Sequence, residues 1–228
     1  MAKRTFAVIG LGRFGSAVAT ELAALGHSVV GIDRDPGHVR DMADVVTQAL
    51  ELDATDERAL RAAGIEDVDV AVISIGEDIE SSVLVVMLAK ELGIDTIVAK
   101  ATTPLHGRIL KKLGVSRVIF PDREMAMRVA HSLAVPNVLD YIELSREFSI
   151  VEIPAPPSFV GRTLKDLAFR QKYGVTLIAI RRADPSGAGE TTYIGPSGDD
   201  EIRVGDVLAL LGPNDKLAQI DALLGKMG

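Results

Sequence analysis

Short apolar runs alternate with helical patterns over roughly the first half of the chain. Runs rich in valine, isoleucine and alanine, bounded by glycine or polar residues, are typical of buried strands. The predicted strands are 6–10, 28–33, 45–49, 68–75, 96–100 and 118–120. The predicted helices are 16–25, a helix from 36 onward, 55–64, 78–92 and 103–113. This alternation predicts a Rossmann-like, doubly wound parallel sheet with right-handed crossovers.

The ends of several helices carry recognisable signals. Gly26 follows the first helix and is a C-terminal stop. Thr55 is expected to cap the third helix, and Thr103 followed by Pro104 is a strong start for the fifth.

After the sixth strand the pattern changes. Residues 124–133 form a predicted helix that is apolar on several sides. Pro136 and Asn137 interrupt it, and the pattern starts again over 138–142. A helix that is apolar most of the way round must be buried against something. The surface that buries this helix is either a partner subunit or the chain's own core, and the sequence leaves both alternatives open.

Pro154, Pro156 and Pro157 mark a change of composition. The elements predicted beyond residue 147 are strand 148–153, helix 163–169, strand 175–181, a turn-rich region over 183–199, strand 206–211 and helix 214–224. We therefore predict a parallel-sheet domain over 1–122, a crossover helix and dimerisation segment over 123–147, and a small α+β domain over 148–228.

Composition narrows the class of protein. The chain has 228 residues, 47% hydrophobic and 25% charged, as an ordinary globular protein has. It has no cysteine, which excludes disulfides and thiolate chemistry and is in keeping with a cytoplasmic protein. A net charge of -7 argues against a nucleic-acid binder. The longest apolar run, 83–89, is far shorter than the ~18 residues of a membrane span, and no signal peptide is recognisable.

Gly10, Gly12 and Gly15 form the pattern G-x-G-x-x-G between a predicted strand and a predicted helix. The first glycine suits a tight turn, the second a close approach of phosphates, and the third a close helix–strand contact. The following helix start offers N–H groups to a phosphate. Asp33 ends the second strand, where a carboxylate receives ribose hydroxyls. The structural alternative is a glycine turn that only packs, with Asp33 as a helix cap.

Three further residues are candidates for the same site. Arg13 adds a cation at the phosphate end of the loop, which suits terminal phosphates. Lys100 and Asp122 end or follow strands at the edge where ligands bind in such sheets. Asp33 would repel a 2′-phosphate, so Arg34 does not indicate NADP. The alternative for Arg13 is a solvated surface arginine, and the alternative for Lys100 and for Asp122 is a surface ion pair.

The sequence contains no persuasive catalytic constellation. The histidines have no spacing typical of metal ligands, and no serine stands in a nucleophile elbow. The histidines are His27, His38, His106 and His131. The sequence therefore predicts a nucleotide site without an enzymatic reaction.

Several segments together resemble the cytosolic regulatory subunits of Ktr- and Trk-type potassium transporters, which consist of N- and C-terminal RCK (KTN) domains. The segments are 6–15, 53–55, 73–76, 98–100, 119–122 and 137–142, together with Asp33, Tyr173-Gly174 and Gly205-Asp206. The chain has one RCK unit, so it is more similar to the Ktr type than to the tandem Trk type.

The resemblance implies a homodimer that assembles into an octameric ring, docked on a membrane-embedded potassium-translocating subunit at the inner face of the membrane. It implies that ATP and ADP compete for the glycine-loop site, with NAD(H) reported for relatives. It also implies a domain-swapped crossover helix over 124–142 and, for some members, cyclic di-AMP between C-terminal domains, where Arg170 and Tyr173 lie in the right region.

The resemblance also assigns roles within the site. Asp53 and Ala54 would lie beside the adenine, and Arg13 would meet the terminal phosphate of the neighbouring subunit's nucleotide. Asp122 would help to hold a cation such as Mg²⁺, although it is shorter than the usual glutamate. The predicted nucleotide-binding residues are Gly10, Leu11, Gly12, Arg13, Phe14, Gly15, Asp33, Arg34, Asp53, Ala54, Ile75, Gly76 and Lys100.

Two other functions use the same glycine loop. One is a small NAD(H)-dependent oxidoreductase, which requires a general acid or base near the nicotinamide. The other is a free-standing ligand sensor that regulates something other than a transporter. The fold alone does not choose among the three.

Overall fold

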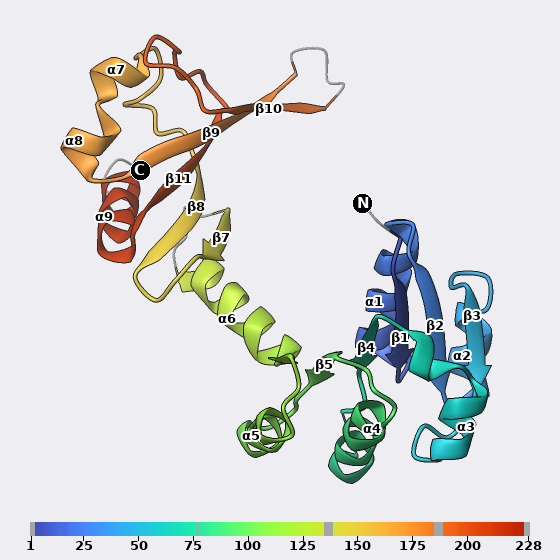
Figure 1. Cartoon of the computed structure of the whole chain (residues 1–228). Helices are drawn as coiled ribbons and strands as arrows, with labels where there is room; N and C mark the ends of the chain where they lie inside the picture. Colours follow the sequence, from blue (N-terminus) through green and yellow to red (C-terminus); the bar gives the residue numbers. More distant parts are fainter. Residues whose placement is uncertain (1–2, 77, 135–138, 185–188, 226–228) are drawn as a thin grey trace. The chain divides into compact units, whose positions relative to one another are not determined.

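The structure is a computed structural model that describes residues 3–76, 78–134, 139–184 and 189–225 (Figure 1). The chain divides into two compact units, Met1–Glu124 and Met125–Gly228. Each unit has its own hydrophobic core, and each is described by itself below.

A six-stranded parallel sheet forms the first unit, in the order β3-β2-β1-β4-β5-β6. Its strands are β1 (Thr5–Ile9), β2 (Ser28–Asp33), β3 (Gln48–Glu51), β4 (Val70–Ile73), β5 (Thr96–Lys100) and β6 (Arg117–Ile119). The order reverses at β1, which pairs with β2 on one side and β4 on the other. The predicted Rossmann-like, doubly wound sheet is confirmed.

Helices cover both faces of this sheet, which explains its continuous apolar strands. They are α1 (Arg13–Ala24), α2 (Pro36–Met42), α3 (Glu57–Ala62), the short 3₁₀ turn Ile65–Asp67, α4 (Ile79–Glu91) and α5 (Pro104–Lys112). Ile9, Ile32 and Ile73 are buried in the core on one face. Val8 and Val29 are buried in the core on the other face. Because all the strands run parallel, the turn after every strand lies at the same edge of the sheet.

Two local predictions in this unit are wrong in detail. The third strand, predicted over 45–49, is Gln48–Glu51, because it pairs in parallel with Val30 to Asp33 of β2. The cap of α3 is Asp56 rather than Thr55, since the Asp56 carboxylate accepts from the amides of Arg58 and Ala59. The expected cap at Thr103 is confirmed, with its hydroxyl accepting from the His106 amide.

The chain from α6 (Pro121–Ala134) to β7 (Asp140–Glu143) departs further from expectation. The predicted return of a helical pattern is wrong for residues 140–142, which form β7 and pair antiparallel with Glu152, Val151 and Ile150. Pro136, Asn137 and Val138 lie outside the described residues. Apolar side chains of α6 are exposed in this single chain: Met125, Met127, Val129 and Leu133. None of the described helices is long and apolar enough to cross a membrane.

The second unit is a small α+β domain, as predicted, built on an antiparallel sheet in the order β10-β9-β11-β8-β7. Its remaining elements are β8 (Phe148–Pro154), α7 (Leu164–Leu167), α8 (Phe169–Tyr173), β9 (Thr176–Ala183), β10 (Glu190–Ile194), β11 (Val207–Pro213) and α9 (Asn214–Gly225). The predicted single helix over 163–169 breaks at Ala168, which has φ +46°. The predicted turn region contains β10, an exposed edge strand paired with β9.

An ion pair with a buried carboxylate ties β9 to the residue just before β11. Nε and Nη2 of Arg182 donate to the two carboxylate oxygens of Asp206, both at 2.7 Å. Asp206 is fully buried, and the Arg203 amide also donates to it at 2.8 Å. Burial raises the pKa of Asp206, but these hydrogen bonds more than offset it and leave the pKa below its ordinary value.

Candidate functional site

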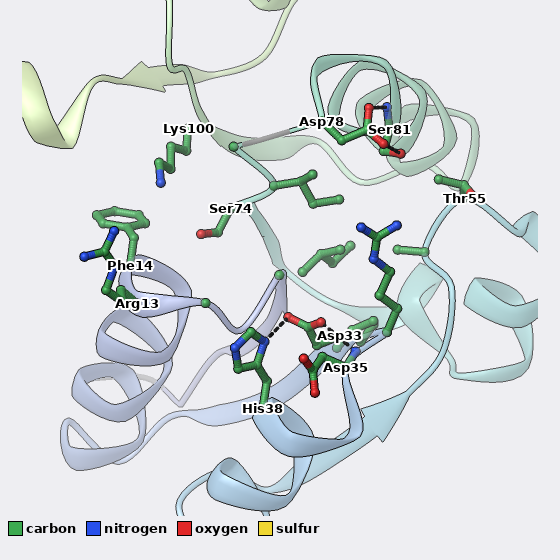
Figure 2. A pocket seen from close by; sticks show the side chains of 18 of the residues that line it. Arg13, Phe14, Asp33, Asp35, His38, Thr55, Ser74, Asp78, Ser81 and Lys100 are labelled. Atoms are coloured by element: carbon green, nitrogen blue, oxygen red, sulfur yellow. Dashed lines mark hydrogen bonds and ion pairs between the residues drawn. The ribbon is translucent and has the colours of Figure 1, made fainter.

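A cavity of about 570 Å³ opens at the carboxyl edge of the parallel sheet, where the glycine loop meets the ends of β2, β3, β4 and β5 (Figure 2). The position follows from the fold, because ligands bind in open α/β sheets at the point where the strand order reverses. The lining residues are Ile9, Gly10, Gly12, Arg13, Phe14, Ile32, Asp33, Arg34, Asp35, His38, Leu52, Asp53, Ala54, Thr55, Ser74, Ile75, Gly76, Asp78, Ser81, Lys100, Thr102 and Asp122.

A different physical reason favours glycine at each of the three glycine positions of the loop. Gly10 has φ +94°, a conformation that side chains disfavour, and a Cβ there would lie 3.1 Å from the carbonyl carbon of Ser74. A Cβ on Gly15 would lie 1.8 Å from the carbonyl oxygen of Gly10, so only glycine allows α1 to approach the loop. A Cβ on Gly12 would meet nothing within 4 Å. The open space in front of Gly12 leaves room for a phosphate.

The N-terminus of α1 faces this space without a side-chain cap. Gly12 is the N-cap residue, and within the described part of the chain no side chain caps the helix by a hydrogen bond. The hydroxyl of Ser16 donates instead to the carbonyl oxygen of Gly12, at 3.0 Å. The first amides of a twelve-residue helix are therefore available to an anion.

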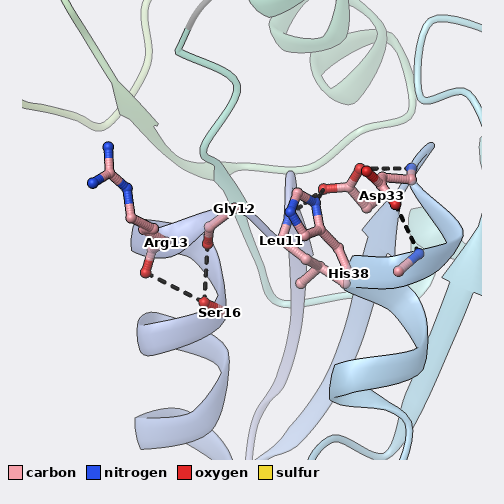
Figure 3. Close-up of polar contacts among 8 residues, drawn as sticks. Leu11, Gly12, Arg13, Ser16, Asp33 and His38 are labelled. Atoms are coloured by element: carbon pink, nitrogen blue, oxygen red, sulfur yellow. Dashed lines mark hydrogen bonds and ion pairs between the residues drawn. The ribbon is translucent and has the colours of Figure 1, made fainter.

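The carboxylate of Asp33 lies at the end of β2 and makes three close polar contacts (Figure 3). Oδ2 accepts from the Leu11 amide at 2.6 Å, and Oδ1 accepts from the Asp35 amide at 2.9 Å. Nδ1 of His38 lies 3.2 Å from Oδ2. These contacts fix the carboxylate beside the glycine loop.

Two other carboxylates on the cavity wall are held by local hydrogen bonds. The hydroxyl of Thr55 donates to Oδ1 of Asp53 at 2.7 Å, and the Thr55 amide donates to the same oxygen at 2.9 Å. The hydroxyl of Ser81 donates to Asp78. The bonds from Thr55 and Ser81 hold the pKa of each carboxyl below its ordinary value, with a smaller contribution from the charge of Arg34. Both carboxylates are therefore ionised near neutral pH.

Cationic side chains gather on the opposite side of the cavity. Nζ of Lys100 lies 5.9 Å from the centroid of the Phe14 ring. Figure 2 shows the Lys100 ammonium and the Arg13 guanidinium on the same side of the cavity as that ring. A Cβ on Gly76 would lie 3.2 Å from Lys100 Nζ, so glycine at this position makes room for the lysine. This side of the cavity suits phosphate groups.

The structure brings most of the predicted site residues together. The predicted residues that line the cavity are Gly10, Gly12, Arg13, Phe14, Asp33, Arg34, Asp53, Ala54, Ile75, Gly76, Lys100 and Asp122. Leu11 and Gly15 do not line it: Leu11 contributes its amide to Asp33, and Gly15 is buried in α1. Asp122 lies at the start of α6, and the described residues contain no group of three or more His, Asp or Glu that could hold a metal ion. A cation beside Asp122 would therefore need phosphate oxygens among its ligands.

Several lining residues were not predicted from the sequence. The polar ones are Asp35, His38, Thr55, Ser74, Asp78, Ser81 and Thr102. Asp35, Ser74 and Thr102 stand one or two residues beyond a strand end, and that position is the signal that would have found them. The others lie four or more residues beyond a strand end. His38 comes from the first turn of α2 and reaches back to Asp33.

In the second unit, the two residues proposed for cyclic di-AMP have structural contacts. Nε of Arg170 donates to the Thr176 hydroxyl at 3.1 Å. The Tyr173 ring packs on Phe159 and Phe169, with centroids 5.7 and 5.8 Å away. Their predicted role in ligand binding stays a prediction.

Comparison with known protein families gives two matches along the chain. Residues 6–121 match the TrkA-N domain, and residues 148–225 match the TrkA-C domain. The chain belongs to the Ktr/Trk family of potassium uptake proteins with RCK domains.

Relatives in this Ktr/Trk family align over almost their whole length. The Ktr system potassium uptake protein C of Bacillus subtilis is 40% identical over 210 residues, which is 92% of each chain. The Ktr system potassium uptake protein A of Vibrio alginolyticus is 34% identical and covers 94% of this chain and 95% of that protein.

Solved structures share the fold of this Ktr/Trk family member at low identity. The GsuK RCK domain superposes with a TM-score of 0.66 at 18% identity over 100% of this chain, which spans 49% of that protein. The TrkA-N domain of the inner membrane protein ybaL from Escherichia coli has a TM-score of 0.51 at 21% identity, over 58% of this chain and 97% of that one.

Proposed function

We propose that this protein is the nucleotide-sensing regulatory subunit of a potassium uptake transporter. The observation that carries the proposal is the open space in front of Gly12, between the uncapped start of α1 and the Asp33 carboxylate. This combination of amide donors and a ribose-binding carboxylate suits an adenine nucleotide. Membership of a family of potassium uptake proteins supplies the process that the nucleotide regulates.

Within the cavity, the phosphates take the glycine loop and the cationic side of Arg13 and Lys100. The ribose hydroxyls donate to Asp33, and the adenine lies beside Asp53 and Ala54. NAD(H) fits the same amides and carboxylate, because its ADP half carries the same groups. Asp122 would help to hold a cation such as Mg²⁺, which would neutralise phosphate charge at this end of the cavity.

The response to ATP rather than ADP depends on Arg13. Its side chain is exposed and lies at the phosphate end of the cavity. A ligand shifts a conformational equilibrium only if it contacts the two states differently. The terminal phosphate of ATP reaches an Arg13 guanidinium, ideally from the neighbouring subunit, whereas ADP does not. Nucleotide identity then changes the geometry of the assembly.

The proposed assembly is a homodimer within a ring of eight subunits, docked on the membrane-embedded potassium-translocating subunit from the cytoplasm. Exposed apolar side chains of α6, including Met125, Val129 and Leu133, support a dimerisation segment there. The protein has no enzymatic activity of its own in this proposal. Cyclic di-AMP at the second unit is a further proposed ligand.

Ligand-dependent thermal stability of the purified protein tests this function. A ligand that binds the folded state raises the melting temperature by linkage. We expect shifts with ATP and with ADP, and a change in the size of the assembly with ATP alone. ATP, ADP, NADH and cyclic di-AMP are compared with and without Mg²⁺. A shift with NADH alone, together with a substrate-dependent change in nicotinamide absorbance, would replace the proposal with an oxidoreductase.

A further inference from the structure

His38 contacts the carboxylate that the proposed function assigns to the ribose. Its Nδ1 atom lies 3.2 Å from Oδ2 of Asp33, and the two side chains are 46% and 13% exposed. His38 also lines the nucleotide cavity itself. Figure 3 shows the imidazole edge directed at the Asp33 carboxylate beside the Leu11 amide. The histidine thus stands where a ribose hydroxyl approaches.

The acceptor positions of Asp33 are nearly all taken. An ionised carboxylate has about four lone-pair positions. The amides of Leu11 and Asp35 use one on each oxygen, and His38 uses a third, on Oδ2. One position therefore remains, on Oδ1. The 2′ and 3′ hydroxyls of a ribose donate two hydrogen bonds, so a ribose that engages both oxygens competes with His38.

We propose that His38 is a specificity-determining residue of the nucleotide site, which must leave Asp33 before a ribose diol binds. When the imidazole leaves, its hydrogen bond to Oδ2 of Asp33 is lost. His38 therefore weakens the binding of ribonucleotides and does not affect a nucleotide that lacks the ribose hydroxyls. The inference rests on the proposed function, because it concerns the same site.

The fold provides space for the displaced imidazole. A second cavity, of about 700 Å³, lies between α1 and α2, and His38 lines it together with Leu11, Met42 and Val45. The imidazole therefore borders both cavities and can leave Asp33 by rotating toward the second. The nucleotide cavity stays formed during this change, because the Leu11 and Asp35 amides still hold the carboxylate.

Other charged groups line the two cavities that His38 also lines. From α1 these are Arg13 and Glu21, from the end of β2 and the segment that follows it they are Asp33, Arg34 and Asp35, and from α2 itself Asp41. Further lining residues of the nucleotide cavity are Asp53, Asp78, Lys100 and Asp122. Among the described residues, Asp33 is the carboxylate within ion-pair distance of His38. The contact of His38 with Asp33 therefore bears directly on the ribose position.

Isothermal titration calorimetry on the full chain tests the inference with two probes, ADP and 2′,3′-dideoxy-ADP. The dideoxy compound has the same phosphates and base and lacks the hydroxyls that compete with His38. We expect His38→Ala to raise the affinity for ADP about two- to fivefold over wild type, because the acceptor position on Oδ2 of Asp33 is then free. The affinity for dideoxy-ADP should change less than about twofold.

The matched control is His27→Ala, which changes a histidine of the same unit that does not line the cavity. It should retain the wild-type affinities for both ligands. Wild-type affinity for ADP in His38→Ala would overturn the inference, and that comparison decides alone if dideoxy-ADP binds too weakly to measure. An equal gain of affinity for both ligands would overturn it as well. If wild-type protein binds no nucleotide, the proposed function fails and the inference fails with it.

Discussion

The amide of Leu11 donates to Oδ2 of Asp33 at 2.6 Å, so one carboxylate both holds the glycine loop and faces the cavity. The bond joins the turn after β1 to the end of β2, which are neighbours in the sheet but 22 residues apart in the chain. Loop geometry and ligand recognition are therefore coupled at a single side chain. A substitution at Asp33 acts on both.

Replacing Asp33 with alanine should cost about 1–3 kcal/mol of stability, because the Leu11 and Asp35 amides lose their charged acceptor. The same change should abolish measurable adenine-nucleotide binding. Chemical denaturation and calorimetry measure the two effects. Asp35→Ala is the control, since it removes the cap of α2 at a cost of about 1 kcal/mol but leaves the glycine loop bonded. Unchanged stability in Asp33→Ala would contradict the role of the Leu11 bond.

The glycines of the loop should separate folding from binding. Gly15→Ala places a Cβ 1.8 Å from the Gly10 carbonyl oxygen, so it should destabilise the first unit by about 1–3 kcal/mol. Gly12→Ala meets no atom within 4 Å and should keep its stability to within about 1 kcal/mol, while weakening nucleotide binding. Urea unfolding followed by ligand titration distinguishes them. Wild-type nucleotide affinity in Gly12→Ala would argue against phosphates in front of this residue.

Local sequence signals were sufficient for the parallel sheet and for the main part of its site. The central strands β1 and β4 are largely apolar runs, and parallel strands bring their carboxyl ends to one edge. Topology alone therefore predicts that the glycine loop, Asp33 and Lys100 lie close together. His38 was missed because its contact with Asp33 depends on the direction in which α2 leaves the sheet.

The failures elsewhere depend on pairing between distant residues. The apolar pattern over 138–142 suits a helix or a strand, and antiparallel pairing with β8 decides for a strand. The segment Glu190–Ile194 lies within a stretch rich in turn residues, and it pairs with β9 as an exposed edge. Neither partner is visible in a local window of sequence.

Arg13 should distinguish ATP from ADP. Its side chain is exposed, so Arg13→Ala should leave the melting temperature of the free protein unchanged. The affinity for ATP should fall about tenfold, because a charged hydrogen bond to the terminal phosphate is lost, whereas that for ADP should change less than about twofold. Titration calorimetry with both nucleotides measures this. Equal losses for ATP and ADP would place Arg13 at the inner phosphates instead.

The stability of the first unit should fall below neutral pH because of His106. This side chain is fully buried in α5, and neither ring nitrogen has a hydrogen-bond partner among the described residues. Burial lowers the pKa of His106, so the unfolded chain binds the proton more tightly than the folded one. Stability is therefore complete above the ordinary histidine value of about 6.5 and declines as the pH falls from there through the folded pKa.

His106→Leu should remove this part of the pH dependence, since leucine has no charge to bury. Thermal unfolding between about pH 7.5 and pH 5 compares the variant with wild type. The control is His27→Leu, which changes a histidine of the same unit that is partly exposed. Unlike the ring of His106, the His27 ring has a hydrogen-bond partner, because its Nδ1 accepts from the Arg4 amide. An identical pH profile in His106→Leu and wild type would show that another group causes the decline.

The Arg182–Asp206 pair should dominate the stability of the second unit. Asp206 is fully buried, and its partner's side chain is 19% exposed. Asp206→Ala leaves a largely buried guanidinium without its carboxylate, and removing one partner of such a pair typically costs about 3–5 kcal/mol. The equivalent change at the surface, Glu57→Ala, breaks the exposed pair with Arg61 and should leave stability nearly unchanged. Because the pKa of Asp206 is lowered, its contribution is complete above the ordinary aspartate value of about 4 and is lost as the pH falls through the lowered value. Urea unfolding of the two variants near pH 7 measures the contrast, and equal losses in both would mean that burial does not strengthen the Arg182–Asp206 pair.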